Sequence, residues 1–218
     1  MIKKKNIITV AIDSGAAAGA GTVAKKIAKH FNLFYLDTGK IYRFIGSLRL
    51  KNPEKFNYSL IKNRINKLKL KNLYSKILLS EEVAISASII AKDNKIRKLV
   101  RNFQKKYAYN PPKKYAGSIL DGRDIATVIM KDAMFKFFIT ANIKVRALRR
   151  FKEYKKLNKK IKFHDVLKSI KKRDKSDKKR KFGKLKKTKE SILINTSKLT
   201  KRACFLKIKH IMDRKLKF

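Results

Sequence analysis

Arginine recurs beside carboxylates and hydroxyls in four short segments of the chain, a combination that suits phosphate chemistry. A guanidinium group is planar and binds two phosphate oxygens through parallel hydrogen bonds. It also neutralises the charge that a phosphoryl group spreads over its oxygens during transfer. Taken singly, each arginine is better explained as a solvated surface residue. The segments are LDTGKIYR (36–43), EEVAISASIIAKDNKIR (81–97), DGRDIATV (121–128) and RDKSDKKR (173–180).

A run of small residues near the N-terminus, AIDSGAAAGAGTVAKK (11–26), has the composition of a phosphate-binding loop. Small residues let backbone N–H groups converge on phosphate oxygens, and a following helix adds its positive end. Thr22 stands where a hydroxyl joins Mg²⁺, but Ala20 fills the position of the usual lysine. The loop alone leaves nucleotide binding and an ordinary tight β–α turn equally open. Beside the arginine segments, it indicates two phosphate-bearing ligands.

Strands and helices alternate along the segments that must position these residues. Apolar runs rich in β-branched or aromatic residues predict strands at 7–12, 33–36, 118–120, 135–140 and 192–194. Helical spacing of apolar residues predicts helices at 21–31, from Thr38-Gly39 onward, over 81–107 with a break near Asp93-Asn94, over 143–172 and over 199–217. This alternation predicts an α/β fold with a parallel sheet. The Lys- and Asn-rich residues 52–80 fit an inserted region.

Composition narrows the class of protein. A chain of 218 residues with 44% apolar residues fits one compact domain with a buried core. The net charge of +45 fits either a nucleic-acid-binding patch or lysines spread over the whole surface. We favour the second because no basic arm stands apart from the fold.

Cys204 is the single cysteine, which excludes an internal disulfide and fits a reducing compartment. The N-terminus superficially resembles a signal peptide, but its apolar run is short and Asp13 interrupts it, so we expect a cytoplasmic protein.

With these motifs together, the sequence resembles the bacterial cytidylate kinases, which are P-loop nucleoside monophosphate kinases. The segments AIDSGAAAGAGT, YLDTGKIYR and DGRDIATVI are similar to that family's IDGPxxxGKGT, LD[ST]GxxYR and DGRDxGTVV. Residues 81–97 resemble its EVxxxAS…VR helix, and residues 173–180 resemble its lid motif. The resemblance implies a three-layer P-loop NTPase fold with a central parallel sheet, an inserted monophosphate-binding subdomain and a helical lid. It implies one domain over 1–218, with a core at 1–50, 81–150 and 185–218, an inserted region at about 51–80 and a lid at about 152–184.

The implied activity is phosphoryl transfer from ATP to CMP or dCMP, with Mg²⁺ as cofactor. The residues implied to bind the ATP phosphates are Gly15, Ala16, Ala17, Ala18, Gly19, Ala20, Gly21 and Thr22, with Thr22 also on the metal. Those implied for CMP are Thr38, Arg43, Ser88, Arg97, Arg123, Asp124 and Arg180, and the catalytic ones are Arg123, Arg173, Arg180 and Asp177. Either Arg146 or Arg149 would also reach the phosphates of ATP. We expect a monomer that binds ATP and CMP or dCMP, with no specific nucleic acid and no membrane.

The chain departs from the family pattern at Ser14, Gly15, Ala126 and, above all, Ala20, which replaces the phosphate-loop lysine. We hypothesise that Lys25, Lys26 or Lys40 supplies the missing cation. A binding-only relative that senses nucleotides is the other explanation. Two further alternatives stay open: a kinase for UMP, AMP or dephospho-coenzyme A, and a basic nucleic-acid-binding protein.

Overall fold

The computed structural model of the chain describes residues 7–156 and 160–216, and within them five strands form one parallel sheet in the order β2-β3-β1-β4-β5. The strands are β1 (Ile8–Ser14), β2 (Leu33–Asp37), β3 (Gly117–Gly122), β4 (Phe135–Thr140) and β5 (Ile192–Asn195). The predicted strands and the parallel α/β sheet are therefore confirmed. Because all strands run in one direction, their carboxyl ends share one edge, where ligands bind in such sheets.

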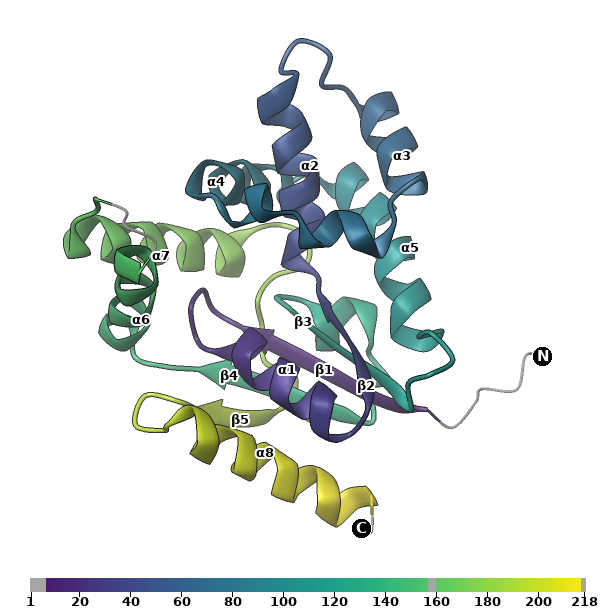
Figure 1. Cartoon of the computed structure of the whole chain (residues 1–218), viewed down its shortest axis with the longest axis vertical. Coiled ribbons are helices and arrows are strands. Elements are labelled where there is room, and N and C mark those ends of the chain that lie inside the picture. The colour runs from purple at the N-terminus through teal and green to yellow at the C-terminus, as the bar shows by residue number, and fades with distance from the viewer. Residues whose placement is uncertain (1–6, 157–159, 217–218) are drawn as a thin grey trace.

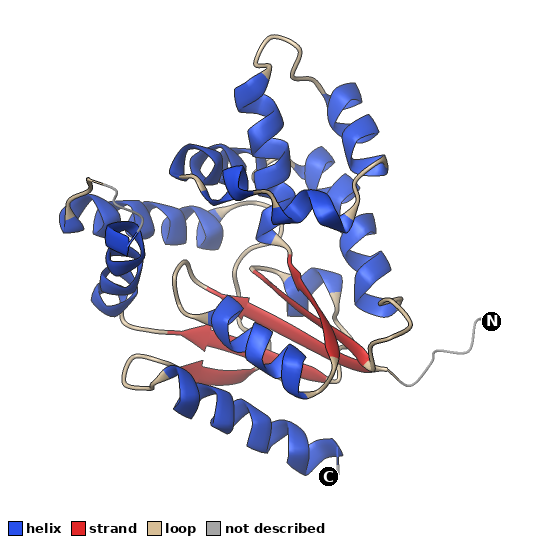
Figure 2. Ribbon diagram, in the orientation of Figure 1, coloured by secondary structure: helices blue, strands red, loops and turns tan. Residues whose placement is uncertain are grey.

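Helices cover both faces of the sheet and gather beyond its carboxyl edge, as Figure 2 shows. The α-helices are α1 (Ala20–His30), α2 (Gly39–Lys51), α3 (Tyr58–Asn66), α4 (Glu81–Ile90), α5 (Asn94–Tyr109), α6 (Ile143–Lys156), α7 (Phe163–Lys179) and α8 (Lys201–Leu216). Shorter turns are η1 (Leu70–Tyr74), η2 (Lys76–Leu79) and the π-helical η3 (Ile125–Ile129). The predicted break near Asp93-Asn94 is confirmed, since the Asp93 carboxylate caps α5 by accepting from the Lys95 and Ile96 N–H groups.

The alternation of side chains along β1 divides the core in two. Val10 and Ile12 pack with α1 and α8 on one face, and Ala11 packs with α2 and α5 on the other. Figure 1 shows α1 and α8 lying along the sheet while α2, α3 and α4 stand beyond one end of it. This is a three-layer α/β arrangement in which the carboxyl edge is left for loops.

Two segments differ from, or add to, what the sequence predicts. The helix expected over 143–172 is two helices, α6 and α7, which pack against each other; residues 157–159 between them lie outside the described residues. The 52–80 region packs Ile61, Ile65 and other apolar residues into the same cluster as β2 and α5. The division into core, inserted region and lid stays a prediction.

A stability prediction follows from the start of β3. A Cβ at Gly117 would overlap the Ile8 carbonyl oxygen, which is backbone and pairs β1 with β3. We expect Gly117→Ala to lower the free energy of unfolding by about 3 kcal/mol, since overpacking next to an immobile backbone cannot relax cheaply. Urea unfolding measures this. Ala116→Ser, at the exposed neighbouring position, should change the free energy of unfolding by less than about 0.5 kcal/mol; equal stability of both variants would contradict the prediction.

Candidate active site

A cavity of about 780 Å³ lies at the carboxyl ends of β1, β2 and β3. The residues that line it include these, which the sequence predicts for the ATP phosphates, CMP or catalysis: Gly15, Ala16, Ala17, Ala18, Gly19, Ala20, Gly21, Thr22, Thr38, Arg43, Ser88, Arg97, Arg123, Asp124, Arg173, Asp177 and Arg180. Segments far apart in the sequence thus meet at one place. Their individual roles stay predictions.

The phosphate loop connects β1 to α1 through residues in unusual backbone conformations. Gly19 has φ of 91° and Ala17 has φ of 58°, both in the left-handed region. Glycine adopts it freely, whereas alanine there costs about 1 kcal/mol or more. α1 begins at Ala20, which lines the cavity, so the unpaired N–H groups of its first turn lie at the cavity. This is the geometry that favours an anion.

The end of β1 is tied to the segment after DGRD by Asp13. Its carboxylate accepts from the Ile125 N–H at 2.7 Å and from the Ala126 N–H at 2.8 Å. Burial, only partly opposed by these two hydrogen bonds, raises the pKa of Asp13 from 3.8 to about 7. Ala126, where the family pattern has glycine, is buried and contributes its backbone N–H here.

The raised pKa of Asp13 predicts a pH-dependent stability. A native pKa above the unfolded value means that the folded state holds the proton more tightly, so stability is complete below pH 4 and falls as pH rises to about 7. We expect the wild-type protein to lose up to about 4 kcal/mol across this window through Asp13 alone. Urea unfolding of wild type and Asp13→Asn between pH 4 and pH 8 measures it. The variant should lack this part of the slope, and parallel profiles would contradict the prediction.

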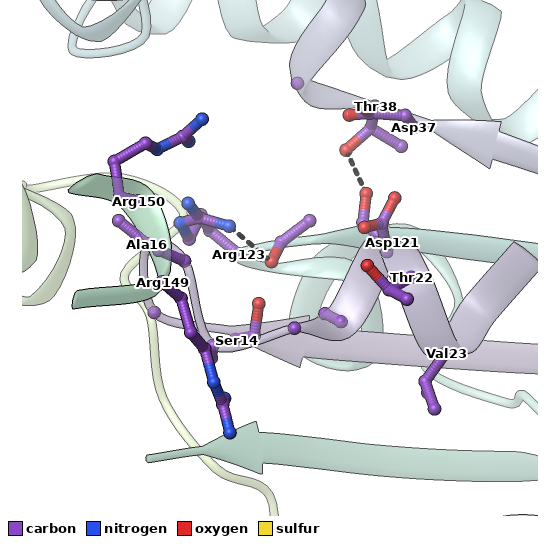
Figure 3. A pocket seen from close by; sticks show the side chains of 18 of the residues that line it. Ser14, Ala16, Thr22, Val23, Asp37, Thr38, Asp121, Arg123, Arg149 and Arg150 are labelled. Atoms are coloured by element: carbon purple, nitrogen blue, oxygen red, sulfur yellow. Dashed lines mark hydrogen bonds between the residues drawn. The ribbon is translucent and has the colours of Figure 1, made fainter. Parts of the chain in front are cut away.

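Two carboxylates that the sequence analysis missed lie near Thr22. Asp37 and Asp121 pair across β2 and β3, and the Tyr35 hydroxyl donates to Asp121 at 3.1 Å. Burial first, and then the charge of Asp37, raise the pKa of Asp121 well above its usual range. In Figure 3 both carboxylates and Thr22 lie at one end of the cavity, and Arg123, Arg149 and Arg150 lie toward the other. The available signal was their place at the ends of adjacent strands, which reach the same edge.

This end of the cavity suits a hard cation. Carboxylate and hydroxyl oxygens are the ligands that Mg²⁺ prefers, and it keeps several waters or phosphate oxygens as well. No group of three or more His, Cys, Asp or Glu ligands forms within the described residues. Two carboxylates and one hydroxyl therefore fit an ion shared with phosphates better than a metal held by protein alone.

The far side of the cavity holds a buried ion pair between Arg97 and Asp124. Arg97 also donates to the Ala91 carbonyl at 3.1 Å, and its guanidinium lies 5.5 Å from the centre of the Tyr42 ring. Burial lowers the pKa of Arg97, but Tyr42 and Asp124 together outweigh it and hold that pKa above its usual range. The pair presents fixed donors and acceptors to a ligand.

Asp177 of α7 joins arginines from two sides of the cavity. It accepts from Arg123 Nε at 2.8 Å and from Arg180 Nη1 at 3.2 Å. Burial raises its pKa, but Arg123, Arg180 and Arg173 outweigh that effect and hold the pKa of Asp177 below 3.8. Arg173 and Asp177 lie on α7, whereas Arg180 lies just beyond its end. α7 ends at Lys179, and Arg180 follows in extended backbone that leads to Gly183, whose carbonyl it contacts.

Arg173 concentrates positive charge at the centre of this cluster. Burial, and then the charge of Arg123, lower the pKa of Arg173 to about 10. Arg43 and Arg150 add to the repulsion. Like charges held together in a partly dry cavity are stabilised when an anion enters. The cluster therefore favours the binding of an anion.

The remaining predicted cations separate into two groups. Arg149 lines the cavity and donates to the Thr196 hydroxyl and carbonyl at 2.9 and 2.7 Å. Arg146 instead lies outside the lining of the cavity. Of the three lysines proposed to replace the phosphate-loop lysine, Lys25 lines the cavity, whereas Lys26 and Lys40 do not. Lys40 lies over the Tyr74 ring, 5.2 Å from its centre.

The first strand of the parallel sheet leads into a phosphate loop, and arginines line the same cavity as that loop. These features are those of a P-loop kinase. The family described as cytidylate kinase matches residues 10–214. The chain is 40% identical over 204 residues to a cytidylate kinase of Clostridium botulinum (strain Hall), covering 88% of this chain and 92% of that protein. It is 41% identical over 201 residues to the cytidylate kinase of Clostridium tetani, covering 87% of each.

The chain belongs to the cytidylate kinase family. It is an enzyme that phosphorylates CMP or dCMP with ATP, as the sequence motifs predict, and nothing favours the alternative functions. A crystal structure of an uncharacterized protein from Eubacterium ventriosum has the same fold, with a TM-score of 0.55 and 20% identity over 95% of this chain and 99% of that one. Within residues 7–156 and 160–216, no helix combines the length and apolar character needed to cross a bilayer.

Proposed function

We propose that the cavity holds ATP and CMP end to end, with the triphosphate on the loop between β1 and α1 and the monophosphate among the arginines. The observation that carries this assignment is the convergence of the loop and the arginines of 36–43, 81–97, 121–124 and 173–180 on one cavity. Such an arrangement converts a two-substrate reaction into an effectively intramolecular one.

The acceptor would bind between the DGRD segment and helices α2, α4 and α5. Arg43 and Arg123 would hold the phosphate of CMP, and Thr38 and Arg180 would close around it. Ser88 and the Arg97–Asp124 pair would face the cytosine ring. Their fixed acceptors and donors would distinguish the amino group of cytosine from the carbonyl group of uracil. A base that leaves such buried groups unpaired is rejected strongly.

The transfer itself needs no covalent enzyme intermediate, since the acceptor is already an anion. Thr22, Asp37 and Asp121 would hold Mg²⁺, which supplies neutralising charge to the phosphates of ATP. Arg123 and Arg173 would neutralise the phosphoryl group in flight, and Asp177 would keep Arg123 in position. Catalysis is then positioning plus charge neutralisation.

Lys25 is the lysine that we assign to replace the one missing at Ala20. It lies one helical turn after Thr22 on the same face of α1, and side chains on a helix lean back toward its N-terminus. Its ammonium lies 6.0 Å from the centre of the Tyr35 ring, and its charge acts on Asp121. Lys25 therefore adds positive charge on the side of the cavity that holds the proposed metal ligands.

An assay of ADP release with Mg-ATP and a panel of acceptors tests the assignment. We expect turnover with CMP and dCMP at least a hundredfold above that with UMP, AMP or dephospho-coenzyme A. Binding of ATP without turnover of any acceptor would contradict it, and so would a preference for another acceptor. We further propose that the enzyme acts as a monomer in the cytoplasm, which sedimentation and fractionation test.

A further inference from the structure

Arg146 and Asp174 form an ion pair outside the cavity lining, and both hydrogen-bond to the backbone of the phosphate loop. The Ala16 N–H donates to Asp174 Oδ1 at 3.2 Å, and the Ala16 carbonyl accepts from Arg146 Nη1 at 3.0 Å. Arg146 Nη2 in turn lies 2.6 Å from Asp174 Oδ2, and their side chains are only 9% and 14% exposed. Both polar groups of one loop residue are thus satisfied by one buried pair.

The two partners come from different helices. Arg146 of α6 is anchored to the sheet, because its Nε donates to the Ala141 carbonyl just after β4 at 2.9 Å. Asp174 belongs to α7, where it lies between Arg173 and Asp177, two residues that line the cavity. The position of α7 and the conformation of the loop are therefore linked through this pair.

The loop has little of its own to hold its shape. Three successive alanines follow Gly15, and Ala17 has a backbone conformation that alanine avoids. Ala20 removes the lysine that would cross the loop. Besides the hydrogen bond from the Ala18 N–H to the Gly15 carbonyl at 3.4 Å, contacts from outside hold the loop. They come from Arg146, Asp174 and the Thr196 hydroxyl, which donates to the Ala18 carbonyl at 3.0 Å.

We propose that Arg146 and Asp174 are positioning residues that couple the closure of α7 to the order of the phosphate loop; this inference rests on the proposed ATP site. With α7 in place, Asp174 fixes the Ala16 peptide and completes the pairing of Arg146. With α7 displaced, the loop N–H and a buried guanidinium both lose their partner, which is costly. An ordered phosphate loop and a closed α7 therefore stabilise each other. The loop N–H groups are best fixed for binding phosphates when Arg173 and Asp177 are also in position.

Asp174→Asn tests the coupling. We expect the Kd and the KM for ATP to rise about tenfold and kcat to fall about tenfold, with a smaller change in the KM for CMP. Removing a carboxylate beside the phosphates would by electrostatics alone tighten ATP binding, so weaker binding isolates the positioning effect. Asp165→Asn is the matched control, since Asp165 begins the same helix with its side chain 60% exposed; its ATP binding and kinetics should equal those of wild type.

Arg146→Lys provides a second variant and a double-mutant cycle. It keeps a positive charge but cannot bond the Ala16 carbonyl, the Ala141 carbonyl and Asp174 together, so we expect the same loss of ATP affinity. The double variant should be no worse than the worse single variant, because the pair acts as a unit. Unchanged or tighter ATP binding in Asp174→Asn, additive losses, or a lower melting temperature with unchanged kinetics would each overturn the proposal. ATP affinity from calorimetry requires no turnover, so failure of the acceptor assay in wild type would count against the proposed function and not against this pair.

Discussion

Replacing Arg123 by methionine should lower kcat/KM for CMP phosphorylation by about a thousandfold, because a guanidinium that stabilises a phosphoryl group in flight is worth that much. In the proposed arrangement, Arg123 would lie where the two substrates meet. Its Nε donates to Asp177 at 2.8 Å and its Nη1 to the Gly122 carbonyl at 3.1 Å. These two hydrogen bonds preorganise the guanidinium group. Initial rates over a matrix of ATP and CMP concentrations measure the effect, which should fall mainly on kcat.

Two companion variants make this result specific. Arg123→Lys keeps the charge but loses the planar fork, and we expect it to recover less than a tenth of the lost activity. Arg64→Met removes an exposed arginine of α3 and should leave both constants at their wild-type values. Because Asp177 keeps Arg180 as a partner, the methionine variant should stay folded, which its melting temperature checks. A loss below tenfold would contradict the role of Arg123.

The parts of the fold that could be predicted are those in which local pattern and tertiary packing agree. β1 and α1 are examples, because the apolar run and the helical spacing at 21–31 both reflect burial on the same face of the sheet. The sequence predicts α6 and α7 as one helix, since both are polar and lysine-rich and the sequence between them contains no proline or glycine. Their separation depends on the contact of Ala147 and Tyr154 with Val166 and Ile170, which the spacing alone does not specify.

The candidate site divides in the same way. Motif residues such as Arg97 and Asp124 could be predicted because the resemblance places them, although their ion pair joins positions that are far apart in the chain. Asp37 lies in the quoted motif LDTG and Asp121 in DGRD, yet neither was assigned to the metal. Their proximity follows from the order β2-β3-β1, a tertiary fact. The contacts of Arg146 with Ala16 and Asp174 are equally invisible to local pattern.

Replacing Lys25 by methionine should lower kcat by about a hundredfold, as expected when one preorganised charge is removed from a phosphoryl-transfer site. The same substitution combined with Ala20→Lys should recover most of that loss, because the lysine returns to the position that the family pattern gives it. Ala20→Lys alone should give activity equal to or below that of wild type, since two ammonium groups would then compete for one place near the phosphates. Single-turnover measurement of CDP formation at saturating Mg-ATP separates the chemical step from product release.

The matched controls are Lys26→Met and Lys40→Met, which remove lysines that do not line the cavity. Both should retain wild-type kcat, and Lys40→Met removes a contact with the Tyr74 ring. Wild-type turnover in Lys25→Met would show that the arginines alone neutralise the phosphates. A gain in kcat from Ala20→Lys in the wild-type background would instead mean that Ala20 lowers activity and that Lys25 does not compensate for it. Rescue confined to the double variant is the result that only replacement by Lys25 explains.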